Sequence, residues 1–400
     1  YEISECLVGS EMCIRDRLYM TPIFQSNSCH KYDTTDYYQI DPSFGTTEDL
    51  KELVQKAHER GMKVVLDAVY NHTGREFFAF ADILENGEKS KYRDWYFIDG
   101  FPLKSEWGEI PNFKCFGYYG GMPKLNLKNP EVEKYITDVA CYWIKECDID
   151  GWRLDVGDEI SHFFWKNFRK AVKAVKKDML IIGEIWHYAG DFLEGDEWDT
   201  VMNYPFYLNL IDLLADEKIT VSQFVQNLGY LKGRLHKNCY PLMWNLIDSH
   251  DTARFLHLCN DNKKKQHLAA AFQLLLPGMP MIYYGDEYAM PGANDPDCRR
   301  GMYWDEEYQD KEMYEWYKRL IQVRKSHACI VEGELAGSVT EDEEGTIVLI
   351  RKNGEETIAM IFNCSSSAKK FNEYTQKYNL LTENTFDGNV EGFDAAVIVL

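Results

Sequence analysis

The sequence predicts an alternating β/α protein, a (β/α)8 barrel, followed by a small antiparallel β domain. Apolar strand-like runs alternate with amphipathic helix-like segments over most of the chain, which is typical of a parallel sheet covered by helices. The length of 400 residues accommodates a barrel of about 250 residues and an appendage. After residue 331, short alternating runs separated by turns replace this rhythm and indicate antiparallel strands.

The individual elements follow from local patterns. Leu18 to Phe24 has the composition of a buried strand, and residues 46–60 form a helix whose Thr-Thr-Glu-Asp opening supplies a cap and first-turn acids. Lys63 to Asp67 is an apolar strand of the kind that parallel sheets use. Residues 73–127 lack the alternation and are rich in glycine and aromatic residues, so they form an excursion. Further strands are expected near 149–155, 179–184, 199–204, 243–248 and 280–285.

Counted from Leu18, these segments give seven strands. A charged helix near residues 308–327 then leads to the C-terminal β domain at 332–400, where runs such as TIVLIRK and ETIAMIF alternate in the manner of strands. The barrel is therefore expected to end near residue 331.

Composition excludes several classes of partner. The chain has 65 Asp and Glu against 44 Lys and Arg, a net charge of -21, which disfavours nucleic acid and anionic membrane surfaces. A neutral polysaccharide is indifferent to this charge, and the 14% aromatic content supplies faces for sugar rings as well as core packing. The 11 cysteines form no CxxC pair, so they indicate neither a disulfide framework nor a zinc site and favour a reducing, cytoplasmic compartment. No apolar run is long enough for a membrane helix.

Three carboxylates, Asp155, Glu184 and Asp251, each stand at the end of a strand-like run. In a parallel barrel the carboxyl ends of the strands converge on one mouth, where active sites lie. Taken singly, each acid is better explained as a helix cap or an ion-pair partner. Together they suit hydrolysis of a glycosidic bond, which needs one carboxyl group to protonate the leaving oxygen and another to attack or stabilise the anomeric carbon.

The neighbours of these acids suggest their roles. Arg153 and Asp155 are two residues apart in a strand and therefore share a face, where the guanidinium favours an ionised Asp155 and makes it the candidate nucleophile. Glu184 lies between apolar residues, which favour the protonated form that a general acid needs. Asp251, beside His250, is expected to bind sugar hydroxyls and stabilise the transition state.

Four segments in this order resemble the signature regions of the α-amylase family of glycoside hydrolases: DAVYNH (67–72), GWRLDVGDE (151–159), GEIW (183–186) and SHD (249–251). MPKLN (122–126) is similar to the fifth region of the neopullulanase, cyclomaltodextrinase and maltogenic amylase branch. The resemblance implies that Asp155 is the nucleophile, Glu184 the acid/base and Asp251 the transition-state stabiliser of a retaining mechanism, in agreement with the chemistry above.

The resemblance also implies a set of substrate-binding residues. Residues 26–47 are similar to the family's loop after the second barrel strand, so His30 and Tyr32 would contact the sugar at the cleavage point, with Tyr32 as a stacking face. Asp67, in the first region, would brace Arg153. The remaining substrate-binding residues implied by the signature regions are His72, Arg153 and His250.

The segment GANDPDCRRGMYWDE (292–306) is similar to the branch's loop after the eighth strand. There, Asp295 and Arg299 would hold the donor-side sugar, although a solvated ion pair explains them equally well. The chain departs from the branch at Gly301, where proline is frequent, and at Gly157, where the branch has a different residue. Neither position is a proposed catalytic group, so the two departures affect the assignment to a subtype and not the mechanism.

The resemblance places the first barrel strand and helix before Leu18. The segment ECLVGSEMCIRDR (5–17) has neither the hydrophobic periodicity of a strand nor that of a helix, and it resembles the translation of a sequencing adapter. We therefore expect residues 1–17 to be non-native, the barrel at 18–331 to lack its first strand and helix, and residues 73–127 to form the family's domain B. The native product would then be longer, and a signal peptide and an N-terminal β-sandwich domain are left open.

The function implied is retaining hydrolysis of α-1,4-glucosidic bonds, with some α-1,6 cleavage and transglycosylation, in maltooligosaccharides, cyclodextrins, pullulan or starch. An oligo-1,6-glucosidase or a transglycosylase is the alternative within the family, and MPKLN argues against the former. A carbohydrate-binding relative without catalysis is a third reading, which the three acids oppose. No cofactor is expected; calcium is left open because Asn71 follows a pattern that sometimes binds it, and a homodimer of the full-length protein also stays open.

Overall fold

The computed structural model describes residues 16–104, 110–236 and 238–400. These residues form two compact units. The first comprises the chain up to Ile185 together with Asp191–Val201, and the second comprises Trp186–Gly190 and Met202–Leu400. The expectations for residues 1–15 lie outside the described residues.

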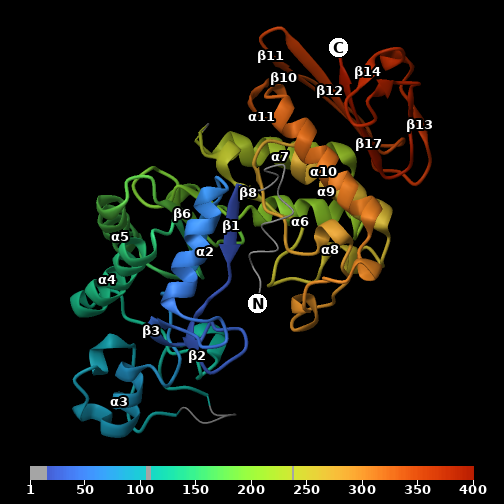
Figure 1. Ribbon diagram of the computed structural model, residues 1–400. Helices are drawn as coiled ribbons and strands as arrows, with labels where there is room; N and C mark the ends of the chain where they lie inside the picture. Colours follow the sequence, from blue (N-terminus) through green and yellow to red (C-terminus); the bar gives the residue numbers. More distant parts are fainter. Residues whose placement is uncertain (1–15, 105–109, 237) are drawn as a thin grey trace. The chain divides into compact units, whose positions relative to one another are not determined.

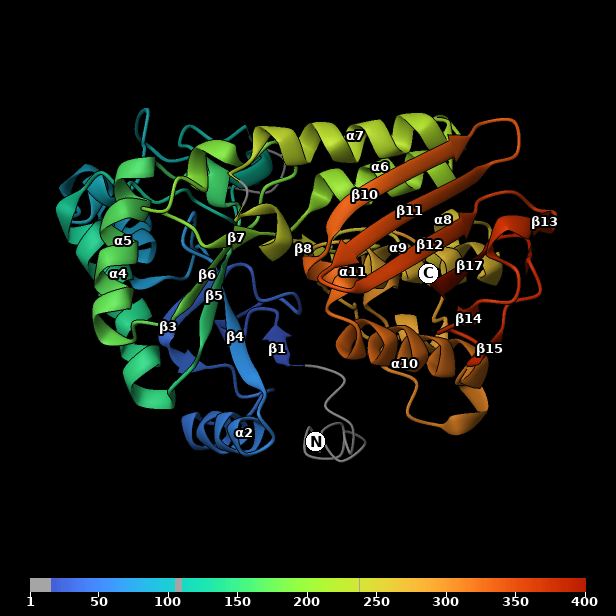
Figure 2. The same cartoon turned by 90° about the horizontal axis from the view of Figure 1, so that it is seen from above.

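The first unit contains a parallel sheet of five strands (Figure 2). In spatial order they are β1 (Arg17–Met20), β4 (Lys63–Ala68), β5 (Gly151–Leu154), β6 (Leu180–Gly183) and β7 (Thr200–Val201). Leu154 is in register with both Ala68 and Gly183. The residues that follow β5 and β6, Asp155 and Glu184, therefore emerge side by side at the carboxyl edge of the sheet.

Helices α2 (Thr47–Glu59), α4 (Pro130–Cys147) and α5 (His162–Val175) belong to this sheet. Thr46 and Asp49 form a capping box at the start of α2, as the sequence predicts. Asn129 caps α4 and Ser161 caps α5, and each helix buries an apolar stripe. Figures 1 and 2 show α4 and α5 side by side.

The first predicted strand is longer than the observed one. β1 covers Arg17–Met20 only, and after Pro22, which has no N–H to donate, a separate antiparallel hairpin begins with β2 (Phe24–Ser26) and β3 (Thr34–Ile40). The segment expected as one strand to Phe24 therefore supplies two different sheets.

The excursion after β4 is mostly irregular. It contains α3 (Phe78–Asn86) and the 3-10 turns η1 (Gly87–Lys89), η2 (Arg93–Trp95) and η3 (Phe116–Tyr118). Isolated bridges from His72 to Lys124 and from Tyr96 to Leu125 join its two ends. The bridge at His72 ties the MPKLN segment to the chain that leaves β4.

The second unit contains a parallel pair of strands, β8 (Trp244–Asn245) and β9 (Met279–Pro280), and Met202 extends this pairing by a bridge to Trp244. Its helices are α6 (Tyr204–Leu214), α7 (Val221–Arg234), α8 (Phe255–Leu258), α9 (Lys263–Leu275), α10 (Lys311–Ser326) and α11 (Cys329–Glu332). With the sheet of the first unit, the described residues contain the seven parallel strands that the sequence predicts.

Several of these strands are shorter than expected, for local reasons. The strand expected at 199–204 ends at Val201, because the Asn203 side chain accepts from Phe206 N and starts α6. The strand expected at 280–285 is β9, which ends at Pro280. Beyond it, the buried Gln273 amide donates to the carbonyl groups of Asn245 and Met281 and takes the place of ladder bonds.

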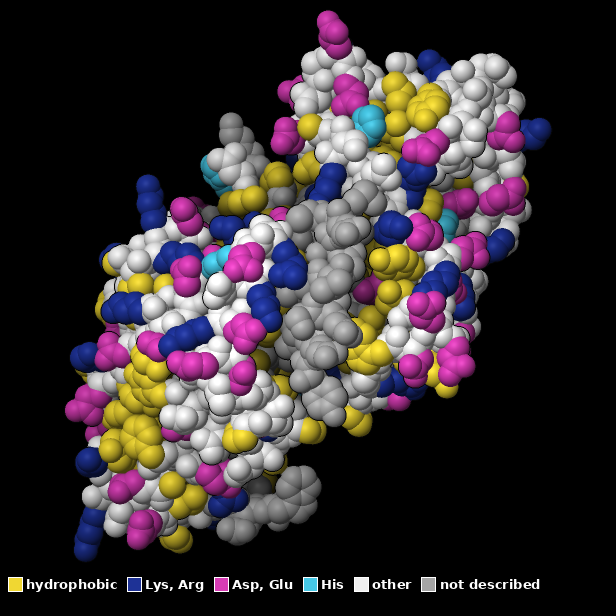
Figure 3. Space-filling model, in the orientation of Figure 1, with side chains coloured by type: hydrophobic (Ala, Val, Ile, Leu, Met, Phe, Trp, Pro, Cys, Tyr) yellow, Lys and Arg dark blue, Asp and Glu magenta, His cyan; other side chains and the backbone are white. Residues whose placement is uncertain are grey.

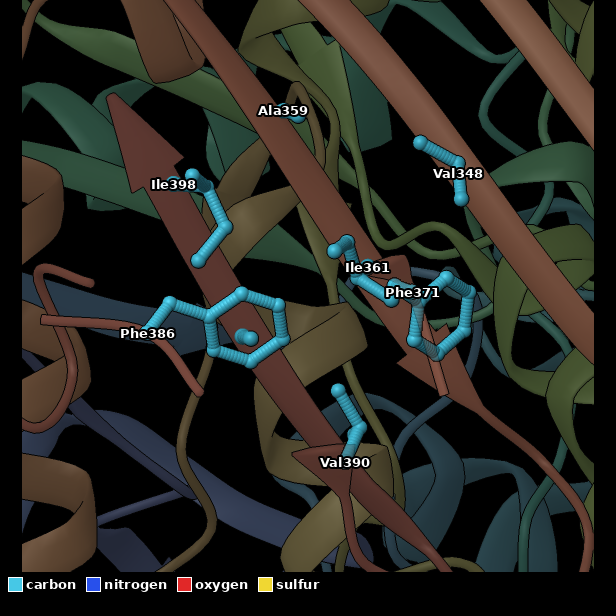
Figure 4. Close-up of a cluster of buried hydrophobic side chains, with 8 residues drawn as sticks. Val348, Ala359, Ile361, Phe371, Phe386, Val390 and Ile398 are labelled. Carbon is cyan, nitrogen blue, oxygen red and sulfur yellow. The ribbon is translucent and has the colours of Figure 1, made fainter. Parts of the chain in front are cut away.

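The C-terminal part forms an antiparallel sheet of six strands. The order is β10 (Glu334–Glu341), β11 (Thr346–Asn353), β12 (Glu356–Asn363), β17 (Asp394–Val399), β14 (Tyr378–Asn379) and β15 (Asn384–Thr385), and β13 (Lys369–Lys370) pairs separately with β16 (Asn389–Val390). Figure 4 shows the cluster that covers one face of this sheet, in which Phe371 and Phe386 pack with Val348, Ile361 and Ile398.

Acidic and basic side chains are interspersed over the face drawn in Figure 3. Within the described part of the chain, no helix combines the length and apolar character needed to cross a bilayer. No disulfide bond joins two cysteines of that part.

Candidate active site

The centre of the first unit's site is the Arg153 guanidinium, which is fully buried. Its Nη1 donates to Asp155 Oδ1 at 3.0 Å and to Asp67 Oδ2 at 3.1 Å, while Nη2 lies 2.9 Å from Glu184 Oε2. Asp155, the residue after β5, thus lies beside Arg153 as their spacing predicts, and Asp67 contacts Arg153. One guanidinium orients three carboxylates that come from three neighbouring strands.

Burial and charge oppose each other in this cluster. Burial raises the pKa of Asp67, while the Arg153 charge and the hydrogen bond from Tyr19 oppose that rise. Burial disfavours the charged form of Arg153, but the charges of Asp67 and Glu184 prevail and raise its pKa well above its ordinary value. Arg153 therefore stays a cation, and Asp67 is held by the hydroxyls of Tyr19 at 2.6 Å and Tyr32 at 3.0 Å.

Val156 turns the chain immediately after Asp155. Its φ of 47° lies in the left-handed region, which β-branched residues rarely adopt. In this conformation the Val156 N–H donates to Glu184 Oε2 at 3.0 Å. The strained turn thus fixes the Glu184 carboxyl group relative to Asp155. No feature of the sequence indicates this role, because valine is a poor residue for such a turn.

Trp198 was not identified from the sequence, yet it packs beneath both carboxylate-bearing turns. It is buried and stacks on Phe192 with ring centroids 4.0 Å apart. A Cβ atom on Gly183 would overlap the indole ring, and one on Gly157 would lie 2.9 Å from Trp198 Cζ2. The glycine at 157, at which the chain departs from the family pattern, is therefore explained by this indole.

Tyr32 is held by both predicted histidines. The buried His72 donates from Nε2 to the Tyr32 carbonyl at 3.0 Å, and His30 Nδ1 accepts from Tyr32 N at 3.0 Å. Burial lowers the pKa of His72 to about 4, so the ring is neutral, and it stacks on Phe116 with centroids 5.3 Å apart. His30, Tyr32 and His72 thus lie together beside Asp67.

The second unit brings together the other predicted residues. His250 Nε2 lies 3.1 Å from Asp251 Oδ2, and Arg299 donates from Nε to the His250 carbonyl at 2.8 Å. Arg299 also pairs with Asp295 at 3.1 Å and lies 3.6 Å from Asp251 Oδ1. The Asp295–Arg299 pair is therefore not an isolated surface ion pair, because Arg299 links its loop to the backbone and carboxylate of the SHD segment.

A buried ionic cluster anchors this loop and was also missed from the sequence. Arg254 is fully buried and donates to Cys298 O at 3.1 Å and to Asp286 Oδ1 at 3.2 Å. Asp248 accepts from Phe255 N at 2.7 Å. Burial, and then the charge of Asp248, raises the pKa of Asp286 well above its ordinary value, and burial raises that of Asp248. One arginine thus faces two buried carboxyl groups.

Trp186, two residues after Glu184, presents an aromatic face. Its side chain is 40% exposed and stacks on Tyr204, with centroids 3.9 Å apart and ring planes 12° from parallel. A backed, exposed ring of this kind is suited to packing against a sugar ring.

Asn71, the residue considered for calcium, belongs to an ion-pair network. Its Nδ2 donates to Glu159 Oε2 at 3.2 Å, and Lys124 of the MPKLN segment donates to the same carboxylate at 2.6 Å. Asn71 Oδ1 is buried without a hydrogen-bond partner. Calcium takes six to eight oxygen ligands, and no group of three or more His, Cys, Asp or Glu residues suited to a metal occurs among the described residues.

Comparison with known proteins gives concordant results. Residues 14–308 match the model of the alpha-amylase catalytic domain. The chain is 48% identical over 351 residues to a cyclomaltodextrinase of Geobacillus thermopakistaniensis, covering 88% of this chain and 59% of that protein. It is 44% identical to neopullulanase 2 of Thermoactinomyces vulgaris (86% and 59% covered) and to an intracellular maltogenic amylase of Bacillus subtilis (86% and 58%). The chain thus spans about six tenths of the length of these relatives.

Solved structures are similar over nearly the whole chain. A cyclomaltodextrinase structure aligns with a TM-score of 0.91 and 39% identity, over 96% of this chain and 68% of that one. The cyclic α-maltosyl-(1→6)-maltose hydrolase of Arthrobacter globiformis aligns with a TM-score of 0.89 and 33% identity, over 100% and 88%. The predicted fold class, a (β/α)8 barrel with a C-terminal antiparallel β domain, is confirmed by these similarities.

Proposed function

Since the chain belongs to the α-amylase family, we propose that it is a retaining α-glycoside hydrolase with Asp155 as nucleophile, Glu184 as acid/base and Asp251 as transition-state stabiliser. The observation that carries this proposal is the contact of one buried guanidinium, that of Arg153, with the carboxylates of both Asp155 and Glu184. A retaining glycosidase needs two carboxyl groups held close together in different protonation states.

The reaction then proceeds in two displacements. An Asp155 carboxylate oxygen attacks the anomeric carbon while the bond to the leaving oxygen breaks, and Glu184 gives its proton to that oxygen. Water next attacks the glycosyl–Asp155 ester, gives a proton to Glu184, and releases the free Asp155 carboxylate. Two inversions return the α configuration. The Arg153 guanidinium stabilises the charge that leaves and returns to Asp155.

We assign the stabilisation of the transition state to Asp251. Asp251 is solvent-exposed and is oriented by His250 and Arg299. Its carboxylate can accept hydrogen bonds from sugar hydroxyls, which strengthen as positive charge develops on the ring. Asp295 and Arg299 would hold the donor-side sugar next to it.

The substrates we propose are maltooligosaccharides, cyclodextrins, pullulan and starch. The names of the relatives, a cyclomaltodextrinase, a neopullulanase and a maltogenic amylase, support α-1,4 cleavage in such glucans. The hydrolase of a cyclic substrate with a (1→6) linkage supports some α-1,6 tolerance. The backed, exposed ring of Trp186 supports binding of a sugar acceptor, and therefore some transfer.

No metal takes part in the proposed reaction. Asn71 offers one oxygen atom, but Lys124 already supplies the positive charge beside Glu159, so these residues do not fit a calcium ion. A cytoplasmic location is supported by the relative described as intracellular. Homodimerisation of the full-length protein belongs to the same proposal.

Product analysis tests the proposed function. The full-length protein is incubated with maltoheptaose, β-cyclodextrin and pullulan, and the anomer of the fresh product is read by NMR. We expect hydrolysis with initial release of the α-anomer, and no hydrolysis by Asp155→Asn. Initial release of the β-anomer would exclude the covalent mechanism, and equal activity of Asp155→Asn would exclude the assignment of the nucleophile.

A further inference from the structure

A cavity of about 410 Å³ lies in the second unit, apart from every residue assigned to the reaction. Its walls include Leu256, Lys263, Tyr288, Tyr303, Tyr308 and Asp310. This volume falls in the range of small-ligand sites, which combine apolar and aromatic walls with a few polar groups.

Three tyrosines supply the aromatic part of the cavity wall. Tyr303 and Tyr308 lie with ring centroids 5.8 Å apart and planes inclined by 49°, and Tyr308 is 59% exposed. Tyr288 is backed by Tyr314 in a parallel stack with centroids 5.2 Å apart. Rings fixed from behind offer flat apolar faces at little cost in side-chain entropy, and their hydroxyl groups can donate and accept hydrogen bonds.

The charged residues of the wall restrict the ligand. Among the lining residues, the carboxylates Asp261, Glu307 and Asp310 outnumber the cation Lys263, which pairs with Asp310 at 2.5 Å. A second cation, Lys311, lies at the edge with its Nζ 2.9 Å from Oε1 of Gln309. This excess of negative charge disfavours phosphates, carboxylates and nucleic acids. A neutral ligand with apolar ring faces and many hydroxyl groups matches both the tyrosines and the carboxylates.

The cavity is built on the same stretch of chain as the predicted donor-side pair. Tyr288 ends η7 (Asp286–Tyr288), Tyr308 ends η9 (Glu306–Tyr308), and Arg299 ends η8 (Asp297–Arg299) between them. The Gln309 amide donates to the Tyr303 carbonyl at 2.8 Å and closes the loop on itself. A side-chain-to-backbone hydrogen bond within the loop therefore helps to hold Tyr303 in place.

We propose that this tyrosine cavity is a second binding site for neutral α-glucan chains, distinct from the site of bond cleavage. The identity of the ligand rests on the proposed function, whereas the existence of the site rests on the cavity itself. It would retain a polymeric or cyclic substrate near the enzyme and would not contribute to cleavage of short substrates.

The test uses β-cyclodextrin as the probe. Binding to the Asp155→Asn chain is titrated by calorimetry, and hydrolysis of p-nitrophenyl α-maltoside is measured on the same cavity variants with Asp155 retained. We expect two binding events, of which Tyr303→Ala and Tyr308→Ala each weaken one by about tenfold, the scale of losing one aromatic contact. Hydrolysis of the short substrate should stay within about twofold of the parent, since the ring lies outside the reacting groups.

Two further variants serve as controls. Tyr230→Ala removes a similarly exposed tyrosine, 66% exposed on α7, and should leave both events unchanged. Tyr308→Phe keeps the ring and the packing, so it should bind nearly as the parent and distinguishes ring loss from misfolding. A single binding event, or equal titrations for Tyr308→Ala and Tyr230→Ala, would overturn the second site while leaving hydrolysis intact. Absence of hydrolysis by the parent would instead overturn the proposed function, and the titration would still decide the cavity.

Discussion

The Trp198 indole ring packs against Gly183 so closely that a methyl group on Gly183 would overlap it. Gly183 is the last residue of β6 and directly precedes Glu184. The Trp198 ring therefore restricts the position of the backbone that carries Glu184, the proposed acid. The same ring limits position 157, in the turn after Asp155.

Gly183→Ala should therefore impair both folding and activity. Overpacking a core costs about 1–3 kcal/mol in stability, and relief of the overlap would shift Glu184. We expect a lower midpoint of urea unfolding and a kcat reduced by at least about tenfold, as for a displaced catalytic group. Gly229→Ala, in α7 where no atom lies within 4 Å of the added Cβ, should be neutral or stabilising. Equal behaviour of the two variants would contradict the role of Trp198.

Substitution of the two carboxylates should separate their roles. Asp155→Asn and Glu184→Gln should each lower kcat on maltoheptaose by several orders of magnitude with little change in the unfolding midpoint. A substrate with a good leaving group needs no proton from Glu184, so it should partly restore the first step in Glu184→Gln only. Burst kinetics with an aryl α-maltoside provide the measurement. Equal restoration of both variants would contradict the assignment.

The buried carboxyl pair should make stability depend on pH. Because the folded-state pKa of Asp286 is raised, the folded protein retains a proton that the unfolded chain releases above about pH 4. The stabilising effect is complete below that pH and is lost as the pH rises through the folded pKa, with a slope of up to about 1.4 kcal/mol per pH unit. Asp286→Asn should flatten this slope in urea unfolding between about pH 5 and 8.

The control for this dependence is Asp297→Asn, which removes a carboxylate from an exposed pair with Arg300 and should leave the slope unchanged. A slope that is the same in Asp286→Asn and in the parent protein would mean that Asp286 is ionised in the folded state.

Chelation should have no effect on the protein. Lys124 neutralises Glu159 at the position where a family pattern at Asn71 sometimes binds calcium. We therefore expect the same melting temperature and activity with EDTA and with added calcium, and a lower melting temperature for Lys124→Met. In that variant added calcium could partly compensate. A rise in the melting temperature of the parent protein on addition of calcium would contradict the ion-pair interpretation.

Much of the fold and the site could be predicted because they depend on local patterns. Strand alternation placed the seven parallel strands, and the two-residue spacing of Arg153 and Asp155 placed them on one face. Strand ends were less predictable. Asn203 starts α6 inside the expected strand by accepting from Phe206 N, and the distant Gln273 amide takes the place of ladder bonds.

The supporting residues could not be found from the sequence. The contact of Trp198 with Gly183 joins residues that are close only after folding. The left-handed turn at Val156 runs against the preference of its residue type. Asp248 and Asp286 form a pair only because two loops meet around Arg254.

The most direct measurement is identification of the covalently labelled residue. The chain is incubated with a 5-fluoro-α-glucosyl fluoride, whose glycosyl–enzyme ester is hydrolysed slowly, and is then digested and analysed by mass spectrometry. We expect one fluoroglucosyl group on the peptide that contains Asp155, and no labelling in Asp155→Asn. A label on Glu184 or Asp251, or turnover that never passes through a labelled protein, would contradict Asp155 as the nucleophile of a retaining glycosidase.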